Sequence, residues 1–255
     1  MKAMFQGYDR LKKILFNLTF YPLFLLLTAG MFGIFFLPVV ILRLLAGARL
    51  TMVVLRWLIW GYGFMIIRVL IFPFVRIEYQ DDEGPRREPC VFVCNHRSAS
   101  DAFLMALLKR EMVQVVNNWP FKIPILGWVA ERAGYLSIQS MPFEDFFTRA
   151  NHLLKQGVSI AAFPEGSRST ELELRQFNGA VFLTAQAARV PVVPVCISGN
   201  EVIPEKGTHI FNPGTIRVHK LTALEWESFK DILPFQFKNK VREILQAEFN
   251  RMQTL

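Results

Sequence analysis

The longest uncharged stretch of the chain, residues 14–42, limits the possible folds more strongly than any other feature. It contains 29 consecutive positions without Asp, Glu, Lys or Arg, whereas a helix that spans a bilayer needs only about 20 apolar residues. The stretch is too long for the apolar core of a signal peptide, and no small-residue cleavage site precedes a polar mature start. A membrane-associated N-terminal segment is therefore predicted.

A second apolar stretch follows at residues 51–75, and Arg56 and Arg68 interrupt it. Arg68 lies near the end, where its charge can reach the interface, whereas Arg56 and Arg49 fall about two helical turns apart on one face. Two geometries fit: a spanning hairpin of two helices, or two kinked helices partly sunk in one leaflet. A pair of buried core helices is the third interpretation, which the length of the uncharged stretch and its basic flanks disfavour.

Both membrane geometries return the chain to the side on which it starts. Four basic residues precede the first stretch and predict that this side is cytoplasmic, at the inner membrane if the protein is bacterial: Lys2, Arg10, Lys12 and Lys13.

The net charge of +8 belongs to the N-terminal part of the chain. Residues 1–76 contain nine Lys/Arg and one acid, while residues 77–255 contain 20 Lys/Arg and 20 Asp/Glu. A nucleic-acid-binding protein usually carries its basic patch on the folded domain, so no nucleic-acid partner is expected. Basic residues beside apolar segments instead predict contact with an anionic lipid surface.

The three cysteines, Cys90, Cys94 and Cys196, each adjoin an apolar run. Such an odd number in a long chain is typical of buried free thiols in a reducing compartment. Cys90 and Cys94 have no second ligand pair at zinc-like spacing, so no metal site is predicted.

A polar turn at residues 76–89 is expected to separate the N-terminal segment, residues 1–75, from a second domain, residues 76–255. After this turn, short apolar runs alternate with helical patterns. Strands are predicted at 91–94, 113–116, 158–163, 192–197 and 215–219, and helices at 101–110, 142–156, 180–189 and 238–253. The alternation predicts an α/β domain with a mixed, largely parallel sheet flanked by helices.

Two polar turns follow predicted strands and carry candidate chemistry. The first contains His96 and, five residues later, Asp101 at the start of a predicted helix. An imidazole acts as a base near neutral pH when a carboxylate fixes one ring nitrogen and leaves the other available. Taken alone, the pair is equally well explained by a helix-capping Asp and a packed His.

The second turn, Glu165-Gly166-Ser167-Arg168, follows the predicted strand 158–163. Glycine permits a tight turn, and arginine supplies a planar donor fork that suits phosphate. Taken alone, the segment is more commonly an ordinary surface turn with an ion pair between Glu165 and Arg168.

Together the two turns, in this order and spacing, resemble the glycerolipid acyltransferase family, whose best-known members are the 1-acylglycerol-3-phosphate acyltransferases. Two further segments match between and after them, and the resemblance covers roughly residues 75–220. The matching segments read Asn95-His96-Arg97-Ser98-Ala99-Ser100-Asp101, Phe121-Lys122-Ile123-Pro124-Ile125-Leu126-Gly127-Trp128, Phe163-Pro164-Glu165-Gly166-Ser167-Arg168-Ser169 and Val190-Pro191-Val192-Val193-Pro194-Val195.

The resemblance implies that His96 is the general base and that Asp101 orients it. The acyl donor would be acyl-CoA or acyl-carrier protein, and the acceptor a lysophospholipid, first of all 1-acylglycerol-3-phosphate. The acceptor's phosphate would be bound by the second turn, and the substrate-binding residues carried over are Glu165, Gly166, Ser167, Arg168, Lys122 and Asn95. No metal or redox cofactor is implied.

The chain departs from the family pattern at two places where family members commonly carry cations. Asn117-Asn118-Trp119-Pro120 replaces Lys-Lys-Glu-Leu, and Gln139-Ser140 replaces Asp-Arg. Fewer cations suit a less charged acceptor, such as a zwitterionic lysophospholipid or an amino-acid lyso-lipid. A non-catalytic membrane protein that binds lipid is a further alternative. His152, His209 and His219 have no partner at suitable spacing and are expected to be surface or packing residues.

Overall fold

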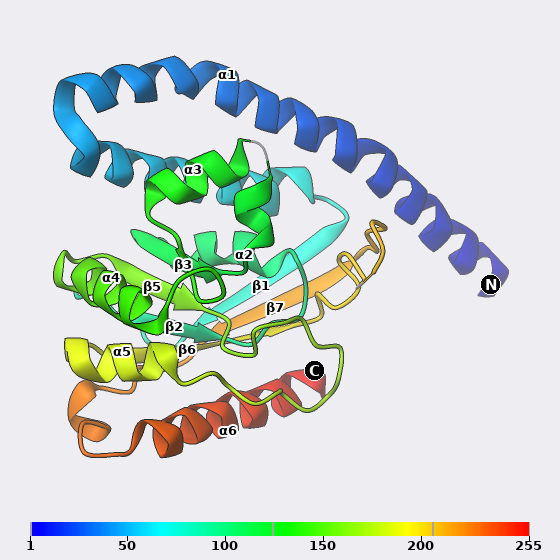
Figure 1. Cartoon of the computed structure of the whole chain (residues 1–255). Helices are drawn as coiled ribbons and strands as arrows, with labels where there is room; N and C mark the ends of the chain where they lie inside the picture. The colour runs from blue at the N-terminus through cyan, green and yellow to red at the C-terminus, as the bar shows by residue number, and fades with distance from the viewer. Residues whose placement is uncertain (1, 124, 206, 255) are drawn as a thin grey trace.

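A seven-stranded sheet forms the centre of the computed structural model, which describes residues 2–123, 125–205 and 207–254 (Figure 1). The strand order is β1-β7-β6-β2-β5-β3-β4, and all neighbours are parallel except β6 and β7. The strands are β1 (Val75–Asp81), β2 (Val91–Cys94), β3 (Met112–Val116), β4 (Leu136–Ser137), β5 (Ser159–Ala162), β6 (Val192–Ser198) and β7 (Gly214–Lys220). The predicted mixed, largely parallel sheet is confirmed.

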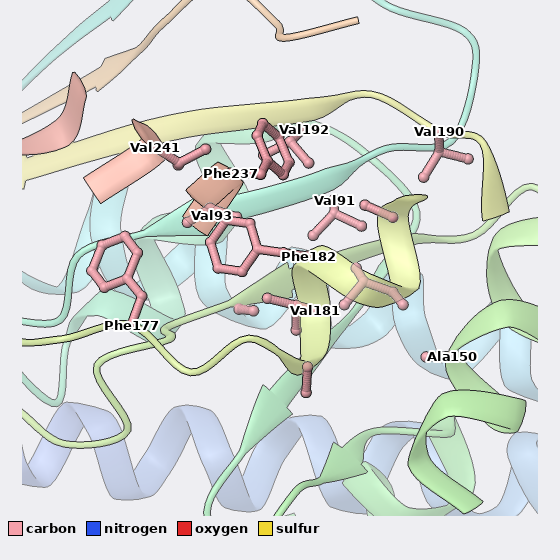
Figure 2. Close-up of a cluster of buried hydrophobic side chains, with 14 of the residues drawn as sticks. Val91, Val93, Ala150, Phe177, Val181, Phe182, Val190, Val192, Phe237 and Val241 are labelled. Atoms are coloured by element: carbon pink, nitrogen blue, oxygen red, sulfur yellow. The ribbon is translucent and has the colours of Figure 1, made fainter. Parts of the chain in front are cut away.

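The central strands are buried on both faces, as expected for a parallel sheet covered by helices. Successive residues of β2 point to opposite faces, so Val91 and Val93 join one core cluster while Phe92 and Cys94 join the other. Figure 2 shows the first cluster, in which Val91 and Val93 lie among side chains of the covering helices. All three cysteines are free and buried, as predicted.

Three helices pack against the first cluster: α4 (Phe143–Lys155), α5 (Ala180–Ala188) and α6 (Pro234–Gln253). All three were predicted, although α6 begins four residues earlier than expected, at Pro234. The predicted helix 101–110 is shorter in the structure. It consists of α2 (Asp101–Leu104) and a 3-10 turn (Met105–Leu108), and it ends because Lys109 has a left-handed φ of 49°.

The predicted polar turn at 76–89 is partly wrong, because its first six residues belong to β1. This strand pairs with β7 along its whole length at the edge of the sheet, where polar side chains such as Arg76 and Glu78 stay accessible. The strand β4 and the helix α3 (Leu126–Ala133) were not predicted either.

The N-terminal segment forms α1 (Lys2–Met65), followed by a π-helical turn (Ile66–Leu70). The helix is interrupted at Gly47, which has φ 78° and ψ −176°, and Figure 1 shows it passing over α3 and turning back. By length and composition it is one helix able to cross a membrane, so the expected two-helix membrane hairpin stays a prediction.

One side of α1 packs onto the rest of the chain and the other side is open. Phe16 and Phe20 are buried in the second core cluster and contact the Phe211 ring at tilted angles, while Leu44 and Leu45 are among the most exposed apolar side chains. The division into residues 1–75 and 76–255 stays a prediction, but the two parts share this core cluster.

Arg56 is buried and does not share an open helical face with the exposed Arg49, although their spacing suggested one face. Its side chain is 3% exposed, its Nε donates to the Ala133 carbonyl at 2.8 Å and its Nη1 pairs with Glu111 at 2.9 Å. A cation is favoured at this position because the carbonyls at the C-terminus of α3 carry partial negative charge.

His219 also has partners that its spacing did not indicate. Its Nδ1 lies 2.6 Å from Glu248 of α6, and its Nε2 lies 2.7 Å from Asp82, directly after β1. The residue connects β7 with α6 and with the end of β1.

Candidate active site

His96 and Asp101 form a hydrogen-bonded pair at the carboxyl end of β2, in which the Asp101 side chain is fully buried and the His96 side chain is 21% exposed. The His96 Nδ1 lies 2.7 Å from Asp101 Oδ2, and the same oxygen accepts hydrogen bonds from the backbone amides of Arg97 at 2.7 Å and Ser98 at 3.0 Å. A fully buried carboxylate is tolerated only with such a set of donors. Because Nδ1 is bonded to Asp101, Nε2 is the ring nitrogen that can take a proton.

The second oxygen of Asp101 is bonded to a residue that sequence reasoning missed. Asn200 is fully buried, and its Nδ2 donates to Asp101 Oδ1. It is the second residue after β6. Gly199, which stands between them, has a φ of 82°. Because β6 and β2 are parallel neighbours, the residues after both strands meet at one edge of the sheet. Only the strand order, which the sequence did not provide, could have indicated Asn200.

Glu165 connects the two turns through their backbones. Its Oε1 accepts from the His96 amide at 2.8 Å and its Oε2 from the Arg175 amide at 3.1 Å. Burial raises the pKa of Glu165 above its ordinary value, although these two amides act in the opposite direction. The amide of Ser169 also donates to the His96 carbonyl, at 3.0 Å. Glu165 therefore positions the His96 backbone, and its predicted contact with substrate stays a prediction.

Asn95 also holds backbone together, and its predicted contact with substrate stays a prediction. It is fully buried, its Nδ2 donates to the Ile197 carbonyl at 2.8 Å, and its Oδ1 accepts from the Ile197 amide at 2.7 Å. Its whole side-chain amide is thus used to join the end of β2 to β6.

His96 opens onto a cavity of about 590 Å³ that continues beneath α1 and α3. Gly166, Ser167 and Arg168 line it close to His96, and Gly166 has a φ of 70° that favours glycine. The remaining wall is mostly apolar and includes Phe32, Phe36, Val39, Leu55, Ile59, Phe103, Met105, Leu126, Trp128 and Val129.

The cavity extends along the sheet for much of the length of β3. Its lining includes Asn117 at the carboxyl end of this strand and Met112 at the amino end, which are about 16 Å apart at the usual strand rise of 3.3 Å. The predicted substrate contact Lys122 is exposed and is not among the lining residues.

The fold, the His–Asp pair and the Gly-Ser-Arg turn at an apolar cavity define an α/β protein of the acyltransferase type. The family model described as Acyltransferase matches residues 76–198. The chloroplastic 1-acyl-sn-glycerol-3-phosphate acyltransferase BAT2 of Brassica napus is 32% identical over 183 residues, which are 69% of this chain and 52% of that protein. The chain belongs to the glycerolipid acyltransferase family.

Two further proteins match this chain over a larger share of their own length. The 1-acyl-sn-glycerol-3-phosphate acyltransferase of Pseudomonas aeruginosa is 26% identical over 204 residues, 76% of both chains. The crystal structure of the 1-acyl-sn-glycerophosphate acyltransferase PlsC from Thermotoga maritima superposes with a TM-score of 0.75 at 18% identity, covering 97% of this chain and 98% of that one. The chain spans about half the length of the plant relative. The structural match to the Thermotoga maritima protein includes α1, because it covers 97% of this chain.

Proposed function

We propose that the protein is a membrane-bound O-acyltransferase that transfers an acyl group from acyl-CoA or acyl-carrier protein to the free hydroxyl of 1-acylglycerol-3-phosphate, giving phosphatidic acid. The observation that carries the proposal is the bonded His96–Asp101 pair at the mouth of an apolar cavity, beside Arg168. The names of the relatives from Brassica napus and Pseudomonas aeruginosa support the same acceptor.

The reaction needs one base and an electrophile that departs readily. Nε2 of His96 takes the proton of the acceptor hydroxyl while its oxygen attacks the thioester carbonyl. The C–S bond then breaks, and the proton on the imidazolium returns to the leaving sulfur. A thiol has a pKa of about 8.5, so it leaves without a strong acid. Asp101 stabilises the imidazolium formed in between. Neither a covalent acyl-enzyme nor a metal or redox cofactor takes part in this scheme.

The cavity has a part for each substrate. Arg168 binds the acceptor's phosphate through its guanidinium, beside the turn formed by Gly166 and Ser167. The apolar wall beneath α1 and α3 accommodates an acyl chain, because burial of each methylene group stabilises the complex by about 0.8 kcal/mol.

The membrane arrangement that fits best is insertion into one leaflet. Inner-face residues along the first half of α1 contact the rest of the molecule, from Phe16 against Phe74 to Phe36 against Trp128. The helix therefore lies along the domain, with its open apolar side towards lipid. The basic N-terminal segment favours an anionic surface and the cytoplasmic side, at the inner membrane in a bacterium.

A panel of acceptors tests the proposal. The full-length protein in anionic lipid vesicles would receive labelled acyl-CoA or acyl-carrier protein together with 1-acylglycerol-3-phosphate, a zwitterionic lysophospholipid or an amino-acid lyso-lipid. We expect the highest kcat/KM with 1-acylglycerol-3-phosphate. A clear preference for another acceptor would favour the alternative suggested by the neutral Asn117, whose Nδ2 donates to the Gly166 carbonyl at 3.3 Å beside the cavity. Absence of transfer to every acceptor would favour a non-catalytic lipid-binding protein.

A further inference from the structure

Arg175 lies against the Gly166–Arg168 turn, and we propose that it is a second phosphate-binding cation of the acceptor site. Its Nη1 donates to Ser167 Oγ at 2.7 Å, and its backbone amide donates to Glu165 Oε2 at 3.1 Å. Ser167 lines the cavity together with Gly166 and Arg168. The guanidinium is thus held next to the part of the wall that approaches His96. This inference rests on the proposed function.

The charge of Arg175 is accessible to an anionic ligand. Its side chain is 38% exposed, and its ion pair with Glu171 is long, at 3.3 Å, with the Glu171 side chain 66% exposed. Exposed pairs of this kind contribute little to stability. A phosphate oxygen therefore replaces the Glu171 carboxylate at small cost and gains a charge-assisted hydrogen bond.

Other cations near the site are unsuited to this role. Arg97 is 2% exposed, and its donors are bonded to the Glu201 carboxylate and the Glu171 carbonyl. Lys122, the cation that the sequence suggested, lies outside the cavity lining, as Arg175 does. Arg175, however, donates a hydrogen bond to the lining residue Ser167 within the Gly166–Arg168 turn.

Two arginines match the charge of the proposed acceptor. A phosphate monoester carries between one and two negative charges at neutral pH, whereas a phosphodiester carries one and a monoacylglycerol none. Arg168 and Arg175 together would balance the monoester. The pair therefore predicts that the chain discriminates among acceptors by headgroup charge, and that Arg175 acts on acceptor binding rather than on the chemical step.

The test compares Arg175→Gln and Arg175→Lys with Arg149→Gln, which removes an exposed arginine of α4. Steady-state kinetics would use the full-length protein in vesicles, with 1-acylglycerol-3-phosphate and with 1-monoacylglycerol as acceptors. We expect Arg175→Gln to raise KM for the phosphate acceptor about tenfold and to leave kcat within about twofold. Arg175→Lys should recover most of the affinity, and Arg149→Gln should behave as the wild type.

A complementary variant predicts a gain. Glu171→Gln removes the competing carboxylate but keeps the carbonyl that Arg97 uses, so KM for the phosphate acceptor should fall about twofold. Because misfolding does not improve binding, this variant remains informative if Arg175→Gln is unstable.

Three results would overturn the inference: an unchanged KM in Arg175→Gln, an equal loss with both acceptors, or Arg175→Lys as poor as Arg175→Gln. Failure of the wild type itself to use the phosphate acceptor would instead refute the proposed function, and this inference with it.

Discussion

The two carboxylate oxygens of Asp101 accept hydrogen bonds from different parts of the chain. Oδ2 is bonded within the turn that also carries His96, whereas Oδ1 depends on Asn200, about a hundred residues later. A hydrogen bond to a charged group contributes about 1.5–3 kcal/mol. The orientation of the candidate base is therefore controlled by the turn after β6.

Replacement of Asn200 by Ala should lower kcat about 10- to 100-fold, because Asp101 loses a charge-assisted bond and no longer fixes the His96 ring. KM for both substrates should stay within about twofold, since Asn200 is not among the residues that line the cavity. Steady-state kinetics measure both values. Asn250→Ala, an exposed change on α6, is the matched control. A rise in KM with unchanged kcat would contradict the positioning role.

The sequence predicted correctly which side chains lie together when each of them directly follows a predicted strand. His96, Asp101 and the turn from Gly166 to Arg168 lie together as expected, because each follows a strand whose carboxyl end reaches the same edge of the sheet. Asn95 and Glu165 are bonded to backbone groups, and their expected contact with substrate stays a prediction. Sequence does not tell whether a buried polar side chain meets a ligand or the backbone of a distant strand.

At the scale of elements, an unbroken run of apolar residues was the most reliable sequence signal for a strand. The buried interior strands were predicted, and β2 was predicted at its observed bounds, because their residues are apolar on both faces. The edge strand β1 was missed because half of its surface is polar and accessible. The helix α3 has eight residues, too few to show a clear helical period.

Gly199 provides a test of how the turn after β6 is built. A Cβ added to it would lie 2.2 Å from the Thr215 carbonyl oxygen, and its φ is 82°. We expect Gly199→Ala to lower the free energy of unfolding by at least about 3 kcal/mol, from backbone strain plus the clash. Gly207→Ala is the control, because Gly207 has a φ of 83° but no atom lies within 4 Å of an added Cβ. Chemical denaturation of both variants measures the difference. Equal losses would show that space at Gly199 is not limiting.

The contacts among β1, β7 and α6 predict a pH effect. Burial acts to raise the pKa of Glu248, but hydrogen bonds from Arg251 and His219 lower it below its ordinary value, and Asp82 also faces His219. A carboxylate with a lowered pKa contributes stability above its unfolded pKa and loses it as the pH falls through the folded one. The melting temperature of Glu248→Gln should therefore fall less than that of the wild type between about pH 5 and pH 3.

Glu243→Gln, an exposed carboxylate on the same helix, serves as the control and should retain the wild-type pH dependence. The same fall in melting temperature in Glu248→Gln as in the wild type would disprove the contribution of Glu248.

At the scale of the whole molecule, α1 is part of the fold as well as the proposed membrane segment. Its inner residues, such as Phe16, Phe20 and Tyr62, belong to the core cluster between α1 and the sheet. In the sequence these residues look the same as the exposed Leu44 and Leu45, so the sequence alone left a spanning hairpin and a one-leaflet arrangement equally open. The position of α1 along the domain favours the second.

Thiol labelling separates the two arrangements. With one-leaflet insertion, Arg49→Cys beside the Gly47 break should react with a membrane-impermeant maleimide from the side on which the domain lies. Arg149→Cys on α4 is the control for that side, and the buried native cysteines give little background. Labelling of Arg49→Cys only after the vesicles are permeabilised would establish a spanning hairpin instead.

The central claim is that Nε2 of His96 removes the proton of the acceptor hydroxyl, and the acyl-transfer rate of His96→Ala tests it most directly. We expect kcat/KM to fall about 10²- to 10⁴-fold, the usual contribution of a general base, while co-sedimentation with lipid vesicles stays unchanged. His152→Ala, which removes an exposed histidine of α4, should keep full activity. Transfer by His96→Ala at more than about a tenth of the wild-type rate would contradict the account.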